Sequence, residues 1–240
     1  MKKSIYLSFD LKSFITLLLV FILTFSLVIA MNYASVTTVS ENIVSLRSVI
    51  VDAGHGGEDG GTQSSAGVLE KEINLDISLK IGTLLRLMGY NVVHTRTDDS
   101  LHYGNDATSQ RQKKVSDIHY RMSIMKNCPD AVFLSIHQNY FTQSKYRGAQ
   151  VFYSKNNALS KTLAQKLQDN IRTLIQPDNE RQIKGSDADI YLLYHAEIPA
   201  VMVECGFMSN PGEALLLSDG EYQKKMSLAI AAGIEEYTTD

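Results

Sequence analysis

The sequence predicts an α/β fold: a single domain whose mostly parallel, twisted sheet is flanked by helices on both faces. Short runs rich in β-branched residues alternate with longer segments of helical period, and no segment repeats along the chain. Strands that alternate with helices are joined by crossovers, which make the strands parallel and pack the helices on the sheet. The 240 residues, 44% apolar and 20% charged, suit one ordinary globular core.

The N-terminal segment differs from the rest of the chain. Three lysines come before or at the start of an uncharged, apolar run over residues 14–31. A basic start and an apolar run are typical of a secretory signal, but the run also reaches the roughly 18 residues of a membrane span. Residues 1–34 are therefore predicted to be a signal peptide or an uncleaved membrane anchor, 35–46 a linker, and 47–240 the globular domain. Because the lysines precede the span, this domain is expected outside the cytoplasm.

The charge of the globular part excludes one class of partner. Beyond residue 34 the chain has 20 basic and 25 acidic residues, a net charge of −5, and no basic stripe. Nucleic-acid binding is therefore not expected. Cys128 and Cys205 are too few for a disulfide framework in a domain of this size and are expected to be buried thiols.

The first half of the domain contains the clearest helical period. Apolar residues at helical spacing predict a helix over 70–89, and Gly89 suits its C-terminal cap. The residues expected on its buried face are Ile73, Ile77, Ile81, Leu84, Leu85 and Met88. The other elements expected in this half are strands over 48–53, 90–96 and 131–137 and a helix over 109–126.

The second half continues the alternation. Its expected elements are strands over 148–154 and 198–207 and helices over 158–175 and 221–237. In an open α/β sheet, ligands bind outside the carboxyl ends of the strands. The polar residues where strands end are therefore the candidates for function.

Polar groups that can do chemistry stand at three strand ends and at one helix start. His55, His137 and Glu204 come from the strand ends, and Glu70 opens the helix over 70–89. Two imidazoles and one carboxylate are the protein ligands of a catalytic Zn²⁺ that keeps a fourth position for water. Such a zinc lowers the pKa of its water to about 7 and polarises a carbonyl. A second carboxylate is then needed to carry a proton to the leaving amine.

Each candidate also has an ordinary interpretation. The glycine-rich turn around His55 lacks the Lys-Ser/Thr of a phosphate loop and the spaced carboxylates of a calcium loop. His137 alone could be a core histidine, but Glu204 in an apolar run is costly unless it is paired or linked to a metal. Cys205 is not favoured as a nucleophile, since it should point to the opposite face of the strand from Glu204. The remaining histidines are expected to be surface or satisfied residues: His94, His102, His119 and His195.

Five segments between residues 48 and 237 together resemble one enzyme family. In order they are "VDAGHGGEDGG", "LEKEINL", "TRTDD", "YRMSIMKNCPDAVFLSIHQN" and "VECGFMSNPGEA". This set resembles the zinc-dependent N-acetylmuramoyl-L-alanine amidases of bacterial cell walls, and most nearly their germination-specific members from spore-forming bacteria. The resemblance implies that His55, Glu70 and His137 bind zinc and that Glu204 is the catalytic carboxylate. Glu72 is the other acid of the second segment, but the family pattern of Glu followed by Lys indicates Glu70.

The resemblance implies a specific activity for residues 47–240. The expected reaction is hydrolysis of the amide between N-acetylmuramic acid and L-alanine in peptidoglycan, in the spore cortex as a step toward muramic-δ-lactam. The expected location is the cell wall or spore envelope. Because no second domain for gripping the wall is evident, a partner protein of the envelope is expected to position or activate the enzyme. The alternatives are a zinc peptidase that cuts stem-peptide cross-links, a catalytically silent envelope scaffold, and a hydrolase with Cys205 as nucleophile.

Four further positions compare with the family pattern. Asn139 matches a polar position near the metal, and Arg121 matches an arginine interpreted as structural. Ala53 stands where the family has proline, and Tyr140 stands where it has a small residue. These two departures affect the rigidity of the metal site and the shape of the substrate cleft, but they remove no catalytic group.

Overall fold

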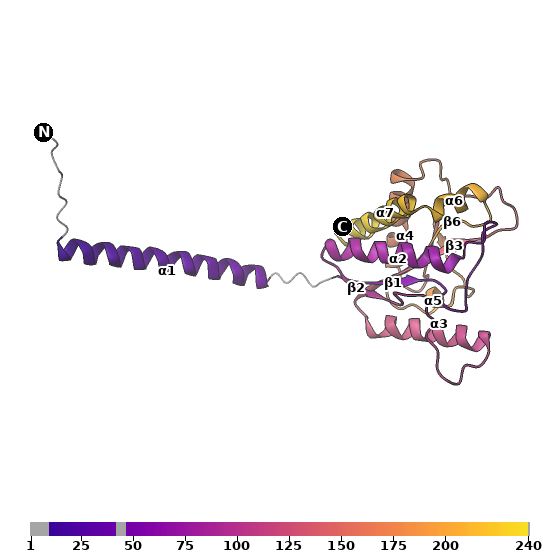
Figure 1. The fold of residues 1–240 in the computed structure, drawn as a ribbon, viewed down its shortest axis with the longest axis horizontal. Coiled ribbons are helices and arrows are strands. Elements are labelled where there is room, and N and C mark those ends of the chain that lie inside the picture. The colour runs from indigo at the N-terminus through magenta and orange to yellow at the C-terminus, as the bar shows by residue number, and fades with distance from the viewer. Residues whose placement is uncertain (1–9, 42–46, 240) are drawn as a thin grey trace. The chain divides into compact units, whose positions relative to one another are not determined.

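The N-terminal unit of the chain is helical. The computed structural model describes residues 10–41 and 47–239, and the chain divides into two compact units, Met1–Ser45 and Leu46–Asp240. Helix α1 (Leu11–Glu41) contains a stretch, Lys12–Ala30, that is long and apolar enough to cross a membrane by length and composition (Figure 1). The helix includes the first part of the predicted linker, while residues 1–9 and 42–46 of the predicted leader and linker lie outside the described residues.

A six-stranded sheet forms the centre of the second unit, in the order β2-β1-β3-β6-β4-β5 (Figure 1). The strands are β1 (Ser48–Ala53), β2 (Asn91–His94), β3 (Ala131–Asn139), β4 (Gln150–Tyr153), β5 (Lys184–Gly185) and β6 (Ala200–Phe207). Every neighbouring pair is parallel except β4 and β6, which are antiparallel. The predicted α/β fold with a mostly parallel sheet is therefore confirmed.

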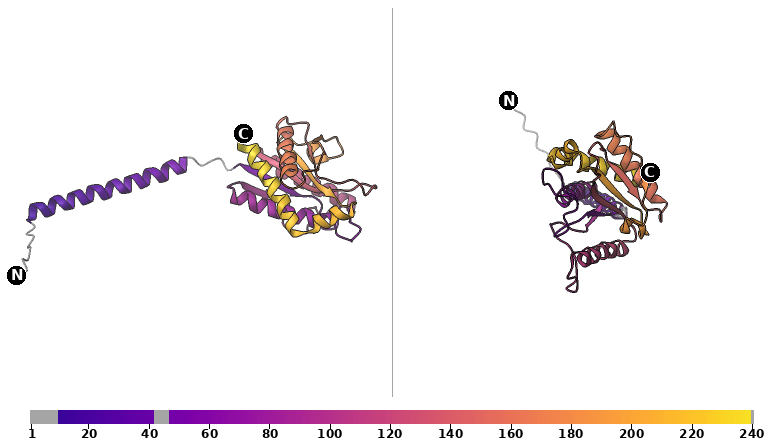
Figure 2. Two further views of the ribbon diagram at one scale, coloured as in Figure 1. Left: turned by 90° about the horizontal axis from the view of Figure 1, so that it is seen from above. Right: turned by 90° about the vertical axis from the view of Figure 1, so that its right-hand side faces the viewer.

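Helices cover both faces of this sheet (Figures 1 and 2). They are α2 (Glu70–Leu87), α3 (Gln110–Asn127), α4 (Leu159–Leu174), α5 (Tyr191–Tyr194), α6 (Pro211–Ser218) and α7 (Gly220–Thr239). Helices α2, α4 and α7 bury their apolar sides in one core cluster, while α3 and α5 contribute to a second. Adjacent residues of β3 alternate between these clusters, Phe133 in one and Leu134 in the other, as expected for a strand buried on both faces.

Three short elements were not predicted from the sequence: β5, α5 and α6. β5 has two residues and α5 has four, too few to show a period. The start of α6 does carry a signal, because Asn210 caps it by accepting a hydrogen bond from the Glu213 amide at 3.0 Å and proline follows at once. Met88, predicted on the buried face of α2, is 41% exposed because the helix ends at Leu87. Gly89, with φ of +89°, turns the chain there as predicted.

Candidate active site

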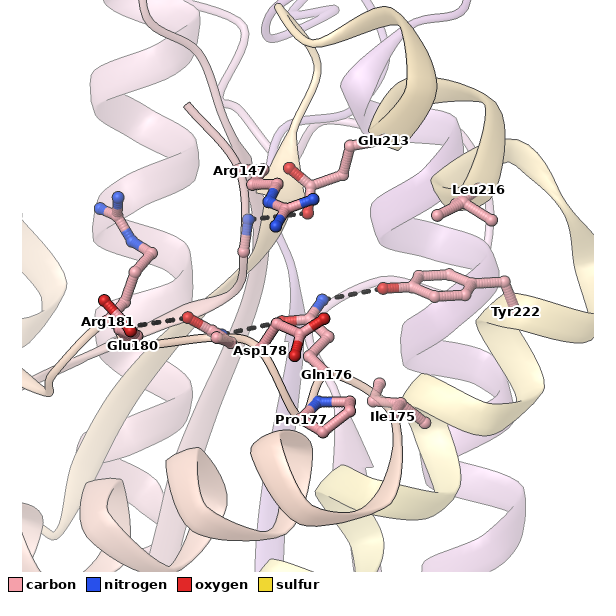
Figure 3. A pocket seen from close by; sticks show the side chains of 12 residues that line it. Arg147, Ile175, Gln176, Pro177, Asp178, Glu180, Arg181, Glu213, Leu216 and Tyr222 are labelled. Atoms are coloured by element: carbon pink, nitrogen blue, oxygen red, sulfur yellow. Dashed lines mark hydrogen bonds between the residues drawn. The ribbon is translucent and has the colours of Figure 1, made fainter. Parts of the chain in front are cut away.

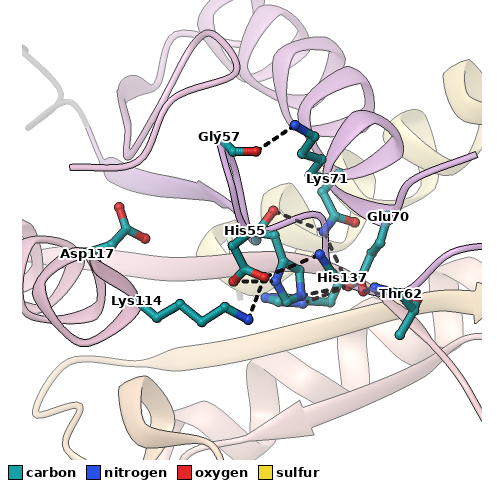
Figure 4. A network of polar contacts seen from close by, with 12 residues as sticks. His55, Gly57, Thr62, Glu70, Lys71, Lys114, Asp117 and His137 are labelled. Atoms are coloured by element: carbon teal, nitrogen blue, oxygen red, sulfur yellow. Dashed lines mark hydrogen bonds and ion pairs between the residues drawn. The ribbon is translucent and has the colours of Figure 1, made fainter. Parts of the chain in front are cut away.

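The carboxyl ends of β1, β3 and β6 lie side by side in the sheet, and the predicted site residues meet there. His55 follows β1, and His137 and Glu204 are opposite each other in the register of β3 and β6. Glu70 is the first residue of α2 and reaches the same place (Figure 4). Ligand atoms of His55, Glu70 and His137 all lie within 4.8 Å of one another. Residues far apart in the chain thus form one group that could hold a metal ion.

Glu70 is the centre of this group. Its Oε1 lies 3.3 Å from His55 Nε2 and 3.0 Å from His137 Nδ1, and the two imidazole rings meet edge-on at 4.9 Å. Two nitrogens and one carboxylate oxygen therefore face a common point, which matches the protein donors of a catalytic zinc. Glu72 is exposed, so Glu70 is the acid of this segment that the fold brings to the histidines.

Further hydrogen bonds fix the Glu70 carboxylate. Oε2 accepts bonds from the Thr62 amide at 2.8 Å and the Thr62 hydroxyl at 3.1 Å, and Oε1 accepts one from the Gln138 amide at 3.1 Å. Burial disfavours the charged form, but hydrogen bonds with His137 and His55 outweigh it and hold the pKa of Glu70 far below its usual range. Glu70 is thus ionised and oriented before any ligand arrives.

His55 adopts a backbone conformation that residues other than glycine rarely take. Its φ is +61°, and it alone among the described non-glycine residues has a positive φ. Its Nδ1 forms a 2.9 Å hydrogen bond with Asp59, whose other oxygen pairs with Lys114 at 2.6 Å. Burial opposes protonation, but the hydrogen bonds to Asp59 and Glu70 raise the pKa of His55 to about 9. Asp59 therefore orients the imidazole as the outer carboxylate of a metal-bound histidine does.

The glycines around His55 are required by close packing. A Cβ on Gly54 would lie 2.2 Å from His137 Nε2, and one on Gly61 would lie 2.5 Å from Glu70 Oε2. The side chain of Arg96 holds the turn by donating to the Gly54 carbonyl at 3.0 Å. The glycine-rich turn around His55 therefore packs directly against the side chains of the site.

A buried ion pair supports the turn from below. Arg121 donates to Asp52 at 2.5 Å, to the Ala53 carbonyl at 2.7 Å and to the His55 carbonyl at 2.8 Å. Burial opposes ionisation, but the charge of Arg121 and neighbouring hydroxyl donors lower the pKa of Asp52. Arg121 thus makes these hydrogen bonds within the protein itself, which agrees with its interpretation as a structural residue. The backbone before His55 is therefore held although Ala53 replaces the family's proline.

Glu204 is partly exposed, but its Oε2 is shielded from solvent and has no hydrogen-bond partner among the described residues. Burial raises the pKa of Glu204 to about 7, against an opposing effect of His137. A carboxyl group that titrates near neutral pH suits general acid and base catalysis.

Cys205 points away into the apolar core, and burial raises the pKa of its thiol well above the usual range. It is therefore not a nucleophile, as the alternation along the strand predicted.

Comparison with known proteins agrees with this geometry. The model of the family described as N-acetylmuramoyl-L-alanine amidase matches residues 49–236. The chain belongs to this family. It is 31% identical over 192 residues to the germination-specific N-acetylmuramoyl-L-alanine amidase of Bacillus subtilis (strain 168), covering 80% of each chain. The predicted family resemblance and the assignment as an enzyme acting on peptidoglycan are thereby confirmed.

Solved structures share the fold of this amidase. The CwlD amidase of Clostridioides difficile, solved in complex with the GerS lipoprotein, is similar with a TM-score of 0.78 and 42% identity, covering 80% of this chain and 98% of that one. The amidase AmiC2 of Nostoc punctiforme is similar with a TM-score of 0.70 and 27% identity, covering 81% and 98%.

Other side chains of the amidase confirm or correct the sequence predictions. His102, His119 and His195 contact tyrosine rings, as ordinary histidines do. His94 does not fit this prediction, because both ring nitrogens are buried without a partner among the described residues and burial lowers its pKa to about 4. Of the two free cysteines, Cys205 is buried as predicted, whereas Cys128 is only partly buried.

The rim beyond β3 contains the two remaining family positions. Asn139 lies where the register of β3 and β6 shifts, and its carbonyl accepts a hydrogen bond from the Met208 amide at 2.8 Å. Tyr140, where the family has a small residue, is 50% exposed. Asp59 is a functional residue that the sequence analysis does not identify, although its place four residues after His55 is visible in the motif.

Proposed function

We propose that this amidase is an exported zinc enzyme that cleaves the amide between the lactyl group of N-acetylmuramic acid and L-alanine. The observation that carries the proposal is the convergence of His55, Glu70 and His137 within 4.8 Å beside Glu204. The family match covers the same residues.

The donor set fits zinc. Two imidazole nitrogens and one ionised carboxylate face a common point, and Asp59 and Thr62 orient His55 and Glu70 from outside. A zinc ion supplies Lewis acidity, which polarises a carbonyl and lets water attack an amide near neutral pH. The residues proposed to hold it are His55, Glu70 and His137.

Glu204 is proposed to move the proton. Its Oε2 has no partner among the described residues and is therefore free to accept a hydrogen bond from the attacking water. The carboxylate takes the proton of that water and then gives it to the nitrogen of the departing L-alanine. A pKa of about 7 allows both steps at neutral pH.

We further propose that the substrate is spore cortex peptidoglycan, where peptide removal precedes formation of muramic-δ-lactam. The support is similarity to the germination-specific amidase of Bacillus subtilis. The apolar stretch Lys12–Ala30 of α1 supports export, either as a signal peptide or as a membrane anchor, with residues 47–240 as the catalytic domain outside the cytoplasm.

An envelope protein is proposed as a partner that positions or activates the enzyme. The similar CwlD amidase was solved in complex with the GerS lipoprotein. Affinity purification of the full-length chain from sporulating cells should enrich an envelope protein. Repeated recovery of the chain alone would contradict this part of the proposal.

The experiment that tests the proposed reaction is digestion of purified cortex peptidoglycan with and without zinc and a chelator. The amidase releases peptides with a free L-alanine amino group and leaves muramic acid intact. A zinc peptidase would instead cut within stem peptides, and a silent scaffold would release nothing. The family match favours the first of these outcomes.

A further inference from the structure

We propose that Arg181 is a substrate-binding residue that pairs with a carboxylate of the stem peptide and so orients the scissile amide at Glu204. This inference rests on the proposed amidase function. It names a feature of the substrate, the free α-carboxylate of the second residue of the stem peptide, which an amidated peptide lacks.

The position of Arg181 follows from the sheet. Gln150, in β4, is directly opposite Glu204 in the antiparallel register of β4 and β6. The Gln150 amide oxygen accepts a hydrogen bond from the Arg181 guanidinium. The centre of that guanidinium also lies 4.9 Å from the ring centre of Phe207, three residues beyond Glu204 on β6. Arg181 therefore stands beside the catalytic carboxylate, on the side away from the metal ligands.

The loop that carries Arg181 is held firmly. The Arg181 amide donates to Asn179 Oδ1 at 3.0 Å, and the Arg181 carbonyl accepts a bond from Arg172 at 3.1 Å. Asn179 in turn donates to the Ala149 carbonyl at 2.9 Å, beside the start of β4. Because this loop is held in place, the Arg181 guanidinium is preorganised and loses little conformational entropy when it binds a ligand.

Among the described residues the guanidinium forms no ion pair. Within the described part of the chain no carboxylate lies within 4.0 Å of it, and its Nε is buried without a hydrogen-bond partner. The nearby Glu213 is already occupied, because it accepts bonds from the amides of Gly148 and Phe207, at 2.9 and 2.8 Å. A partly buried cation without a paired carboxylate is costly until an anion binds it.

Arg181 borders an 880 Å³ pocket whose lining also contains the carboxylates of Asp178, Glu180 and Glu213 (Figure 3). These carboxylates disfavour an anion inside the pocket, so the substrate carboxylate is expected outside it, on the side of the guanidinium toward Gln150 and Glu204. The planar guanidinium of arginine can donate two parallel hydrogen bonds to a carboxylate. It therefore binds a carboxylate more strongly than an amide.

The test compares two muramyl tripeptides that differ only at the second residue, a glutamate with a free α-carboxylate and its α-amide. Wild type is expected to prefer the carboxylate about 10- to 100-fold in kcat/KM. Arg181→Gln should remove this preference, and Arg181→Lys should restore part of it. Lys184→Gln, which removes an exposed cation three residues away, should retain it. Thermal unfolding of each variant shows whether it is folded.

The outcomes are distinct. Equal rates of wild type on both substrates, or an equal loss on both in folded Arg181→Gln, would overturn the role of Arg181 while leaving the amidase function standing. Failure of zinc-loaded wild type to hydrolyse either tripeptide or intact peptidoglycan would overturn the proposed function, and the role of Arg181 with it.

Discussion

His137 and Glu204 are direct partners across the β3–β6 ladder. One is a proposed metal ligand and the other the proposed proton carrier, and the sheet fixes their separation through two backbones that are buried on both faces. Their roles should therefore be separable by mutation, because each side chain projects from a rigid strand and neither holds the other in place.

Glu204→Gln is expected to retain zinc and to lose turnover. The amide keeps the size of the side chain but cannot accept the proton of the attacking water, so kcat should fall by at least about a hundredfold. Metal analysis and kinetics on the same sample check this. His55→Ala should lose both metal and turnover, and substantial activity in the Glu204 variant would refute its role.

Asp59→Asn is expected to weaken zinc binding about 10- to 100-fold, because the carboxylate that orients His55 is lost. Competition with a fluorescent chelator measures the affinity. The matched control is Glu58→Gln, which breaks only the ion pair of Glu58 with Lys113 on the surface and should bind zinc normally. The same affinity in both variants would show that Asp59 does not support the metal site.

Zinc affinity should rise with pH up to about 9. In the metal-free protein the pKa of His55 is raised to about 9, and zinc binds only the neutral imidazole. The expected slope is about tenfold in affinity per pH unit between pH 6.5 and 9. By the same shift, the stabilisation that His55 gives the metal-free protein is complete below pH 6.5 and is lost as pH rises through 9. An affinity that stays flat over this range would contradict the assignment.

Arg121→Met is expected to destabilise the fold by about 3–5 kcal/mol, because it leaves the buried Asp52 carboxylate without its partner. Urea unfolding of the metal-free protein measures the loss. Adding Asp52→Asn to this variant should recover part of it, since it removes one of the two buried carboxylates, Asp52 and Asp117, that lose Arg121 as a partner. Wild-type stability in the single variant would show that the ion pair does not support the turn.

Cys205→Ala should leave kcat/KM within about twofold of wild type. The free energy of unfolding should fall by about 1–2 kcal/mol, because a buried core side chain becomes smaller. Thiol alkylation should likewise leave the folded enzyme active, whereas chelators should inactivate it. A folded Cys205→Ala protein without activity would revive the nucleophile mechanism.

The sequence predicted the long elements well because burial dictates their period. Ile73, Ile77 and Ile81 recur at helical spacing and are all buried in α2. The same logic located the site, since the ends of neighbouring parallel strands must converge and His55, His137 and Glu204 stand at such ends. The short elements β5 and α5 offered no period to recognise.

Contacts that depend on the folded chain could not be predicted. The pairing of Asp59 with His55 depends on the conformation of the turn, in which His55 has a positive φ. Arg181 meets Gln150 only because β4 is antiparallel to β6, a reversal the alternation of elements does not indicate. His94 looked like an ordinary histidine, although in the fold both its ring nitrogens are buried.

The most direct test of the proposed reaction is mass spectrometry of cortex peptidoglycan digested by the zinc-loaded protein. A zinc amidase should release free stem peptides that begin with L-alanine and leave glycan whose muramic acid is intact, and chelation should abolish this release. Cleavage inside the stem peptides, or the same products in the presence of a chelator, would contradict a zinc amidase built on His55, Glu70 and His137.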